Sequence, residues 1–121
     1  RYSEMPKFGA DGLLEEAQIG EVVEYVLQMS GQEHDATLAS AGATVFADNC
    51  AACHMEAGEG DRTQGAPALN DAIWLYGGDR ASLTATIVNA RAGAMPAWGN
   101  RLDPVTIKML AAYVHSRGGG E

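Results

Sequence analysis

Cys50-Ala51-Ala52-Cys53-His54 is the stretch from which the fold of this chain can be inferred, and it contains both cysteines of the sequence. Two cysteines separated by two residues and followed directly by histidine form the attachment signature of a c-type haem. Residues i and i+3 lie on one face of a helical turn, so both thiols can add to the vinyl groups of a single porphyrin. The adjacent imidazole would then lie under the ring and ligate the iron. We call residues 50–54 the CxxCH motif.

A zinc half-site and a thioredoxin-type redox pair are the other uses of two cysteines at this spacing. Structural zinc takes four protein ligands, and the sequence has no second Cys/His pair at a suitable spacing. A thioredoxin-type pair belongs beside a βαβ pattern, which the sequence does not show. We therefore expect one haem c, attached through Cys50 and Cys53.

A second axial ligand for the iron is expected in the loop Gly93-Ala94-Met95-Pro96-Ala97-Trp98-Gly99. An iron that transfers electrons without binding substrate stays six-coordinate, and methionine opposite histidine raises its reduction potential. Pro96 fixes the backbone after Met95, and the flanking glycines allow close approach to the ring. We expect His54 and Met95 to ligate the iron. The alternative for Met95 is an ordinary core position.

The segment Gly65-Ala66-Pro67-Ala68-Leu69 supplies candidates for the histidine side of the haem. A metal-bound histidine donates its second ring N–H to an acceptor that fixes the orientation of the ring. We expect the Pro67 carbonyl to accept this bond and Leu69 to pack on the haem face. Further candidates for haem contacts, with core packing or solvent exposure as the alternative, are Trp74, Tyr76 and Arg91 at the propionates and Trp98 beside Met95.

Apolar residues recur at helical spacing in three stretches of the second part of the chain. They predict helices over residues 35–49, from Asp79 or Arg80 to about residue 90, and over 103–117. Asp103-Pro104 is typical of a helix start, because aspartate caps the helix and proline suits its first position. In no stretch of useful length do apolar and polar residues alternate with the period of two that is typical of a β-strand. The sequence therefore predicts an all-α fold.

The predicted helices over 35–49 and 103–117 are expected to cross. Gly42 lies in the middle of the first helix and allows close backbone contact. The residues expected in this contact are Leu38, Val45 and Phe46 on the first helix, with Leu110 and Tyr113 against Phe46 on the second.

The chain contains an internal repeat with a period of about ninety residues. Met5-Pro6-Lys7-Phe8-Gly9 parallels Met95-Pro96-Ala97-Trp98-Gly99. The similarity continues into the following helix, where Ile19, Tyr25 and Val26 parallel Ile107, Tyr113 and Val114. Such self-similarity indicates duplicated units. We interpret residues 1–31 as the last loop and helix of a preceding haem domain, 32–37 as a linker, and 38–121 as a complete monohaem domain. The alternative is an amphipathic helix with a chance similarity at its start.

The predicted N-terminal helix is amphipathic and needs a partner for its apolar stripe. We expect the stripe to pack on the haem domain or to pair with a second chain, which would give a homodimer through residues 1–31. The two faces are Glu15, Glu16, Glu21 and Glu24 on the solvent side and Ile19, Val22, Val23 and Val26 on the apolar side.

The chain has a formal net charge of −8, and residues 1–37 hold eight of its acidic side chains against Arg1 and Lys7. This balance argues against nucleic acid or an anionic membrane surface as a partner. No apolar run approaches membrane-spanning length, and the first residues do not resemble a signal peptide. Because covalent haem attachment takes place on the outer side of the bacterial inner membrane, we expect a targeting or anchoring segment upstream.

Three strings make a family resemblance specific: Trp74-Leu75-Tyr76-Gly77-Gly78, the Met95-Pro96-Ala97-Trp98-Gly99 loop, and the ending Tyr113-Val114-His115-Ser116-Arg117-Gly118-Gly119-Gly120. The chain resembles the dihaem cytochrome c subunit (subunit III) of cbb3-type cytochrome c oxidases over nearly its whole length. The resemblance implies a cytochrome c fold with an additional N-terminal helix. It also implies thioether bonds at Cys50 and Cys53, and iron ligation by His54 and Met95.

By this resemblance, the function is electron transfer and not catalysis by the chain itself. The subunit resembled is held by an N-terminal membrane helix, exposes its haem domains to the periplasm, and relays electrons from a soluble cytochrome or quinol-oxidising complex to the catalytic haem-copper subunit. Two alternatives stay open from the residues alone. They are a stand-alone periplasmic c-type cytochrome, and a haem enzyme or gas sensor with a labile methionine ligand.

Overall fold

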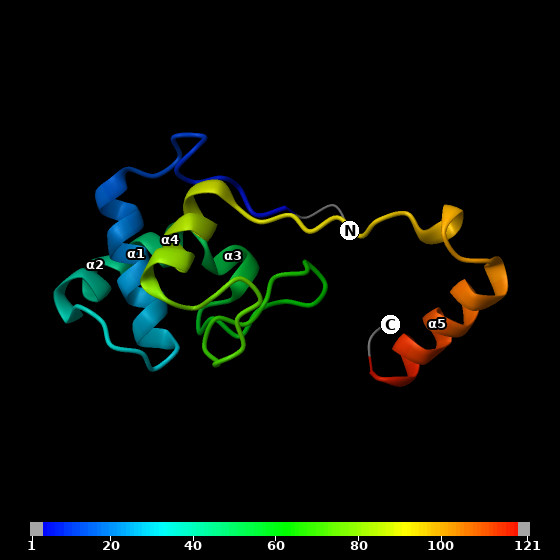
Figure 1. Ribbon diagram of the computed structural model, residues 1–121. Coiled ribbons are helices and arrows are strands. Elements are labelled where there is room, and N and C mark those ends of the chain that lie inside the picture. Colours follow the sequence, from blue (N-terminus) through cyan, green and yellow to red (C-terminus); the bar gives the residue numbers. More distant parts are fainter. Residues whose placement is uncertain (1–3, 119–121) are drawn as a thin grey trace.

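The computed structural model describes residues 4–118, and over this range the protein consists of helices and loops (Figure 1). The predicted all-α class is confirmed, because between these residues the only β-type pairing is an isolated bridge joining Asp61 and Ala66. None of the helices in the described range is both long and apolar enough to cross a membrane. Gly119 and Gly120 of the glycine-rich ending lie outside the described residues. The elements are α1 (Glu16–Met29), α2 (Ala36–Asn49), α3 (Ala51–His54), α4 (Arg80–Asn89), the 3-10 helix η1 (Trp98–Asn100) and α5 (Pro104–Ser116).

Aspartate caps begin three of the helices at the positions that the sequence predicts. The Asp35 carboxylate accepts from the backbone N–H groups of the first turn of α2, and Asp79 does the same for α4. Asp103 caps α5, with Pro104 as the first helical residue. Each cap satisfies backbone donors that have no partner inside the helix. These helix starts are therefore set by local sequence.

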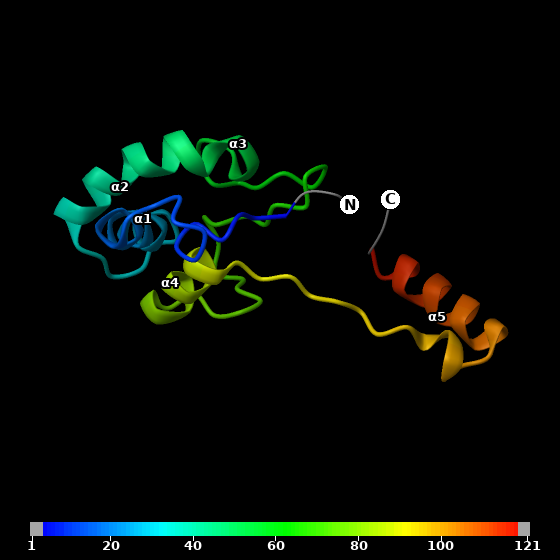
Figure 2. The ribbon, with the colours of Figure 1, turned by 90° about the horizontal axis from the view of Figure 1, so that it is seen from above.

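The core lies where α1 packs against α2 and α4, as Figures 1 and 2 show from two directions. Gly42 lies at the crossing of α1 and α2, where a Cβ would overlap the Glu21 carbonyl. The rings of Tyr25 and Phe46 pack beside this point with centroids 5.3 Å apart. Helix α1 is therefore seated on α2 by a close backbone approach. The buried apolar residues are Phe8, Leu14, Ile19, Val22, Val23, Val26, Leu27, Ala39, Val45, Phe46, Leu83 and Ile87.

The expected crossing of residues 35–49 with residues 103–117 is wrong. Helix α5 contacts only η1, and the segment before it extends away from the rest of the molecule (Figure 2). Leu110 and Tyr113 are 48% and 63% exposed, whereas Phe46 packs against Tyr25. The physical reason is that the internal repeat gives the chain two helices of similar apolar pattern, and α1 is the one that packs on α2. Helix α1 carries the same apolar pattern as α5, and the close approach at Gly42 leaves room for one helix only.

Two further burial predictions are wrong, at Glu24 and Leu38. Glu24 was expected on the solvent face of α1 but is 5% exposed, because α1 is covered by α4 as well as by α2. Leu38 is 42% exposed. The buried stripe of α2 begins one residue later, at Ala39, and continues through Gly42 and Phe46.

The buried Glu24 carboxylate joins three elements. Its Oε2 accepts from Nη2 of Arg80 at 3.0 Å and from the backbone N–H of Asp35 at 2.7 Å, while its Oε1 accepts from Nε of Arg80. Glu24 lies on α1, Arg80 begins α4, and Asp35 caps α2. The Arg80 hydrogen bonds lower the pKa of Glu24 and outweigh the opposing effect of burial. This ion pair therefore fixes α1 to the body of the protein.

Glu24→Gln should destabilise the haem-loaded chain by about 1.5 kcal/mol at pH 7, the lower end for charge-assisted hydrogen bonds, because the Arg80 side chain is 57% exposed. Denaturant unfolding measures this difference, and Glu21→Gln is the matched control in α1. Because folding lowers the pKa of Glu24, its contribution is present above the ordinary value of 4.5 and is lost as pH falls through the lowered pKa. A difference between variant and wild type that stayed constant down to acidic pH would contradict this role.

Candidate functional site

The CxxCH motif forms a single turn at the end of α2. The Cys50 N–H still donates to the Phe46 carbonyl of α2 at 2.8 Å, and the N–H groups of Cys53 and His54 turn back to the Cys50 carbonyl at 3.1 and 2.9 Å. Cys50 is half-buried and Cys53 is exposed. The helical turn inferred from the spacing is therefore present.

The side chain of His54 is oriented by the loop that follows. Its Nδ1 lies 2.9 Å from the carbonyl oxygen of Pro67. Because a carbonyl can only accept, Nδ1 donates in this contact, and in a neutral imidazole Nε2 is then the nitrogen that can bind a metal ion. The hydrogen bond expected between these residues is thus found in the structure.

The loop between His54 and Leu69 folds back on the CxxCH motif through backbone hydrogen bonds. Gly60 N–H donates to the His54 carbonyl at 3.0 Å, and Leu69 N–H donates to the Gly58 carbonyl at 2.6 Å. Gly60 has φ +77°, and a Cβ there would lie 2.6 Å from the carbonyl carbon of Pro67. Glycine is therefore required at residue 60 for the loop to place Pro67 against His54.

Gln64 also contacts the motif, and sequence analysis missed it. Its Nε2 donates to the Ala52 carbonyl at 2.9 Å, and its Oε1 accepts a weak bond from the Cys53 thiol at 3.5 Å. A lone glutamine in a polar loop gives no sequence signal. Only the fold of the loop shows that it braces the motif.

Burial changes the chemistry of one of the two cysteines. Removal from water raises the pKa of the Cys50 thiol to about 11, and the nearby Cys53 adds to this shift. Thiolates react far faster than thiols. In this fold Cys50 is consequently a neutral thiol at physiological pH.

The side chains predicted to contact the haem differ in how they are packed. Leu69 and Trp74 are half-buried and pack against the same core as Cys50. Met95 is 84% exposed on the extended segment before α5. Among the other candidates, Arg91 lies 5.3 Å from the Tyr76 ring centroid, and Trp98 in η1 is contacted by Arg101 at 5.4 Å.

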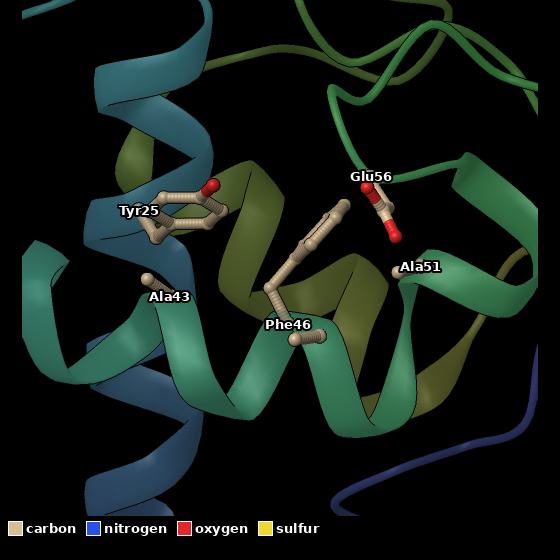
Figure 3. Close-up of a pocket in the computed structure, with 6 residues that line it drawn as sticks. Tyr25, Ala43, Phe46, Ala51 and Glu56 are labelled. Carbon is tan, nitrogen blue, oxygen red and sulfur yellow. The ribbon is translucent and has the colours of Figure 1, made fainter.

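A small pocket of about 270 Å³ opens between α1, α2 and the start of α3 (Figure 3). In Figure 3 the rings of Tyr25 and Phe46 and the carboxylate of Glu56 point toward it. Ala51 of the CxxCH motif lines it, whereas Cys50, Cys53 and His54 do not. The lining residues are Tyr25, Ala43, Phe46, Ala47, Ala51 and Glu56.

The residues on the histidine side fit a c-type haem. A thiol pair on one helical turn matches the two points of covalent attachment, and an imidazole whose Nδ1 is already hydrogen-bonded presents Nε2 as a ligand. The structure does not bring Met95 to this site.

Comparison with known proteins identifies a family for this chain. The family model for cytochrome c oxidase, cbb3-type, subunit III matches residues 37–114. The cbb3-type cytochrome c oxidase subunit CcoP of Cereibacter sphaeroides is 65% identical over 121 residues, which are all of this chain and 42% of that protein. CcoP of Azospirillum brasilense is 52% identical over 97% of this chain and 41% of its own length, and FixP of Bradyrhizobium sp. ORS 278 is 53% identical over the whole chain and 42% of its own.

The chain thus spans about two fifths of the length of these relatives. The family model covers most of the chain and includes the CxxCH motif, the Pro67 loop and most of α5. This chain belongs to the subunit III family of cbb3-type cytochrome c oxidases.

Proposed function

We propose that this chain carries one covalently attached haem c and transfers electrons as part of the cytochrome c subunit of a cbb3-type oxidase. The observation that supports this most is the CxxCH motif on one helical turn with His54 held by the Pro67 carbonyl at 2.9 Å. It occurs in a chain matched by the subunit III family model. The haem supplies the one-electron chemistry, and the protein supplies attachment, ligands and a docking surface. By itself the chain is not an enzyme.

The residues of this chain have distinct roles in the proposal. Cys50 and Cys53 form the thioether bonds, and His54 ligates the iron through Nε2. Met95 is the second axial ligand, which raises the reduction potential. Residues 91–103 must then fold back toward the motif, since Met95 is 84% exposed in the structure. Leu69, Trp74, Arg91 and Trp98 are proposed to contact the haem once this segment has closed over it.

The cellular setting is also part of the proposal. Residues 38–121 would form one complete monohaem domain after a linker at 32–37, with residues 1–31 belonging to a preceding haem domain. The domain would face the periplasm and receive electrons from a soluble cytochrome or quinol-oxidising complex. It would pass them to the catalytic subunit. The argument for a homodimer through residues 1–31 was that the apolar face of α1 needs a partner. This face is buried within the chain, so the argument no longer applies.

A spectroscopic experiment on the haem-loaded chain tests the electron-transfer function. The oxidised protein should show the weak near-infrared band of sulfur-to-iron charge transfer, because a thioether completes the coordination. It should cycle reversibly by one electron, and the reduced form should bind carbon monoxide slowly. A wild-type chain without the band would contradict methionine ligation.

A haem enzyme or gas sensor with an open sixth site is the second candidate. The exposed position of Met95 favours it, because in this arrangement Met95 is not packed against the CxxCH motif. Rapid carbon monoxide binding by the reduced chain would support this function over electron transfer.

A further inference from the structure

The contact that orients His54 lies on the surface of the protein. The Pro67 carbonyl accepts a hydrogen bond from Nδ1 of His54 at 2.9 Å. Pro67 is exposed, so burial in the core does not hold it in place. The position of its carbonyl oxygen therefore depends on the hydrogen bonds of the loop that carries it.

A small hairpin of residues 61–66, which we call the Asp61 hairpin, ends directly before Pro67. Its two end residues are paired through the backbone: the Asp61 N–H donates to the Ala66 carbonyl at 3.0 Å, and the Ala66 N–H donates to the Asp61 carbonyl at 2.9 Å. Gly65 has a φ of 74°, which glycine adopts without strain, and it makes the tight return possible. The hairpin is thus a closed unit, and its end fixes where Pro67 begins.

Gln64 connects the Asp61 hairpin to the CxxCH motif. Its Nε2 donates to the Ala52 carbonyl at 2.9 Å. On the hairpin side, the same Nε2 lies 3.4 Å from Oδ2 of Asp61. The Gln64 side chain is half-buried between these two partners. It therefore joins the helical turn that carries His54 to the hairpin that precedes Pro67.

The bond from Gln64 to Ala52 does not depend on a free thiol. In the structure the Cys53 thiol donates to Oε1 of Gln64 at 3.5 Å, but a thioether bond at Cys53 would replace the S–H bond that makes this contact. The Ala52 carbonyl belongs to the backbone and remains an acceptor when haem is attached. The contact with Ala52 is consequently the one through which Gln64 can act on a bound haem.

Two contacts hold the same helical turn from the same loop. Gln64 binds Ala52, and three residues later Pro67 binds His54. Without the first contact the hairpin can shift relative to the motif, and the second contact weakens, because hydrogen bonds depend steeply on distance and angle. A metal-bound histidine with a well-formed bond at its second nitrogen is a more basic ligand. A more basic ligand stabilises ferric iron over ferrous iron, so this bond lowers the reduction potential.

We propose that Gln64 is a positioning residue that lowers the reduction potential of the haem iron, because it holds the Pro67 carbonyl on Nδ1 of His54. This inference rests on the proposed haem attachment and on His54 as an axial ligand. Gln64 carries no charge, so its effect on the potential is not an effect of charge near the iron. With the potential held lower, the reduced haem passes its electron on more readily.

Redox titration of the haem-loaded chain tests the proposal. Gln64→Met removes the hydrogen bond to Ala52 at nearly constant side-chain shape and charge. The reduction potential of this variant should rise. We expect a roughly two- to tenfold shift in the ratio of ferrous to ferric haem, which is about 18–59 mV for one electron. Gln64→Asn keeps the amide but is one methylene shorter. It should raise the potential too, and it provides the test if Gln64→Met does not take up haem.

Asn70→Leu is the matched control. Asn70 also spans this loop with a side-chain amide, but its Nδ2 donates to the Ala57 carbonyl at 3.0 Å, which lies outside the CxxCH motif. Loss of this bond should leave the reduction potential unchanged. A rise in Asn70→Leu equal to that in Gln64→Met would overturn the proposal, because any loosening of the loop would then have the same effect.

The direction of the shift separates positioning from a loss of structure. A variant that admitted water to the haem would have a lower potential, because water stabilises the more highly charged ferric state. NMR of the reduced chain gives a second readout. The Nδ1 proton of His54 should exchange with water faster in Gln64→Met than in the wild type or in Asn70→Leu. A potential that falls or stays constant in the Gln64 variants would overturn the proposal, and so would an unchanged exchange rate.

The inference and the proposed function fail in different ways. A wild-type chain that carries no covalent haem, or whose haem does not cycle reversibly by one electron, contradicts the proposed function. A redox-active wild type with Gln64 variants of unchanged potential contradicts only the role of Gln64 and leaves the electron-transfer function intact.

Discussion

A chain with Cys50→Ala and Cys53→Ala should carry no covalently attached haem. The sequence has no other cysteine, so no thiol remains to form a thioether bond. Mass spectrometry under denaturing conditions should show the mass of the polypeptide alone, whereas the wild type should carry one additional haem. Ala52→Ser is the matched control, because residue 52 lies inside the motif on an exposed position and is not a ligand.

The same variant should also be much less stable than the haem-loaded wild type. A small domain buries a limited core, and a large apolar cofactor tied to its first helices adds to that core. We expect the cooperative thermal transition of the haem-loaded chain to be absent or strongly broadened without haem, as followed by circular dichroism. A haem-free chain that melted as cooperatively as the wild type would show that the helical core is self-sufficient.

Features that depend on residues close together in sequence could be predicted. The caps at Asp35, Asp79 and Asp103 act on backbone groups within three residues, and the CxxCH motif is one turn of helix. The contact between His54 and Pro67 spans only thirteen residues. It could be anticipated because a metal-bound histidine needs an acceptor for its second nitrogen.

Features that depend on contacts between distant segments could not be predicted. The repeat indicates two helices with one apolar pattern, but the position of α1 includes the pair of Glu24 with Arg80, which are 56 residues apart. The amphipathic pattern of α1 places Glu24 on the solvent face, because such a pattern assumes that the helix packs on one side only. In the structure α1 packs against both α2 and α4, and Glu24 is buried. The position of Met95 also depends on distant contacts, because α5 contacts only η1 and the loop before it is exposed.

Gly42→Ala should be the most destabilising small substitution in the helical core. An alanine normally favours a helix interior over glycine by about 1 kcal/mol. Here its Cβ would overlap the Glu21 carbonyl, which is backbone and cannot rotate away. The helices must then separate, which opens the packing around Phe46, and such overpacking costs about 3 kcal/mol. Denaturant unfolding of the haem-loaded chain at neutral pH should show a loss of this size.

Gly20→Ala is the control that separates steric overlap from helix propensity. Gly20 is exposed within α1, and a Cβ there would meet nothing within 4 Å. This substitution should stabilise the chain by about 0.5–1 kcal/mol. Two glycine-to-alanine changes on crossing helices are thus expected to have opposite signs. Equal effects in the two variants would contradict the backbone contact at Gly42.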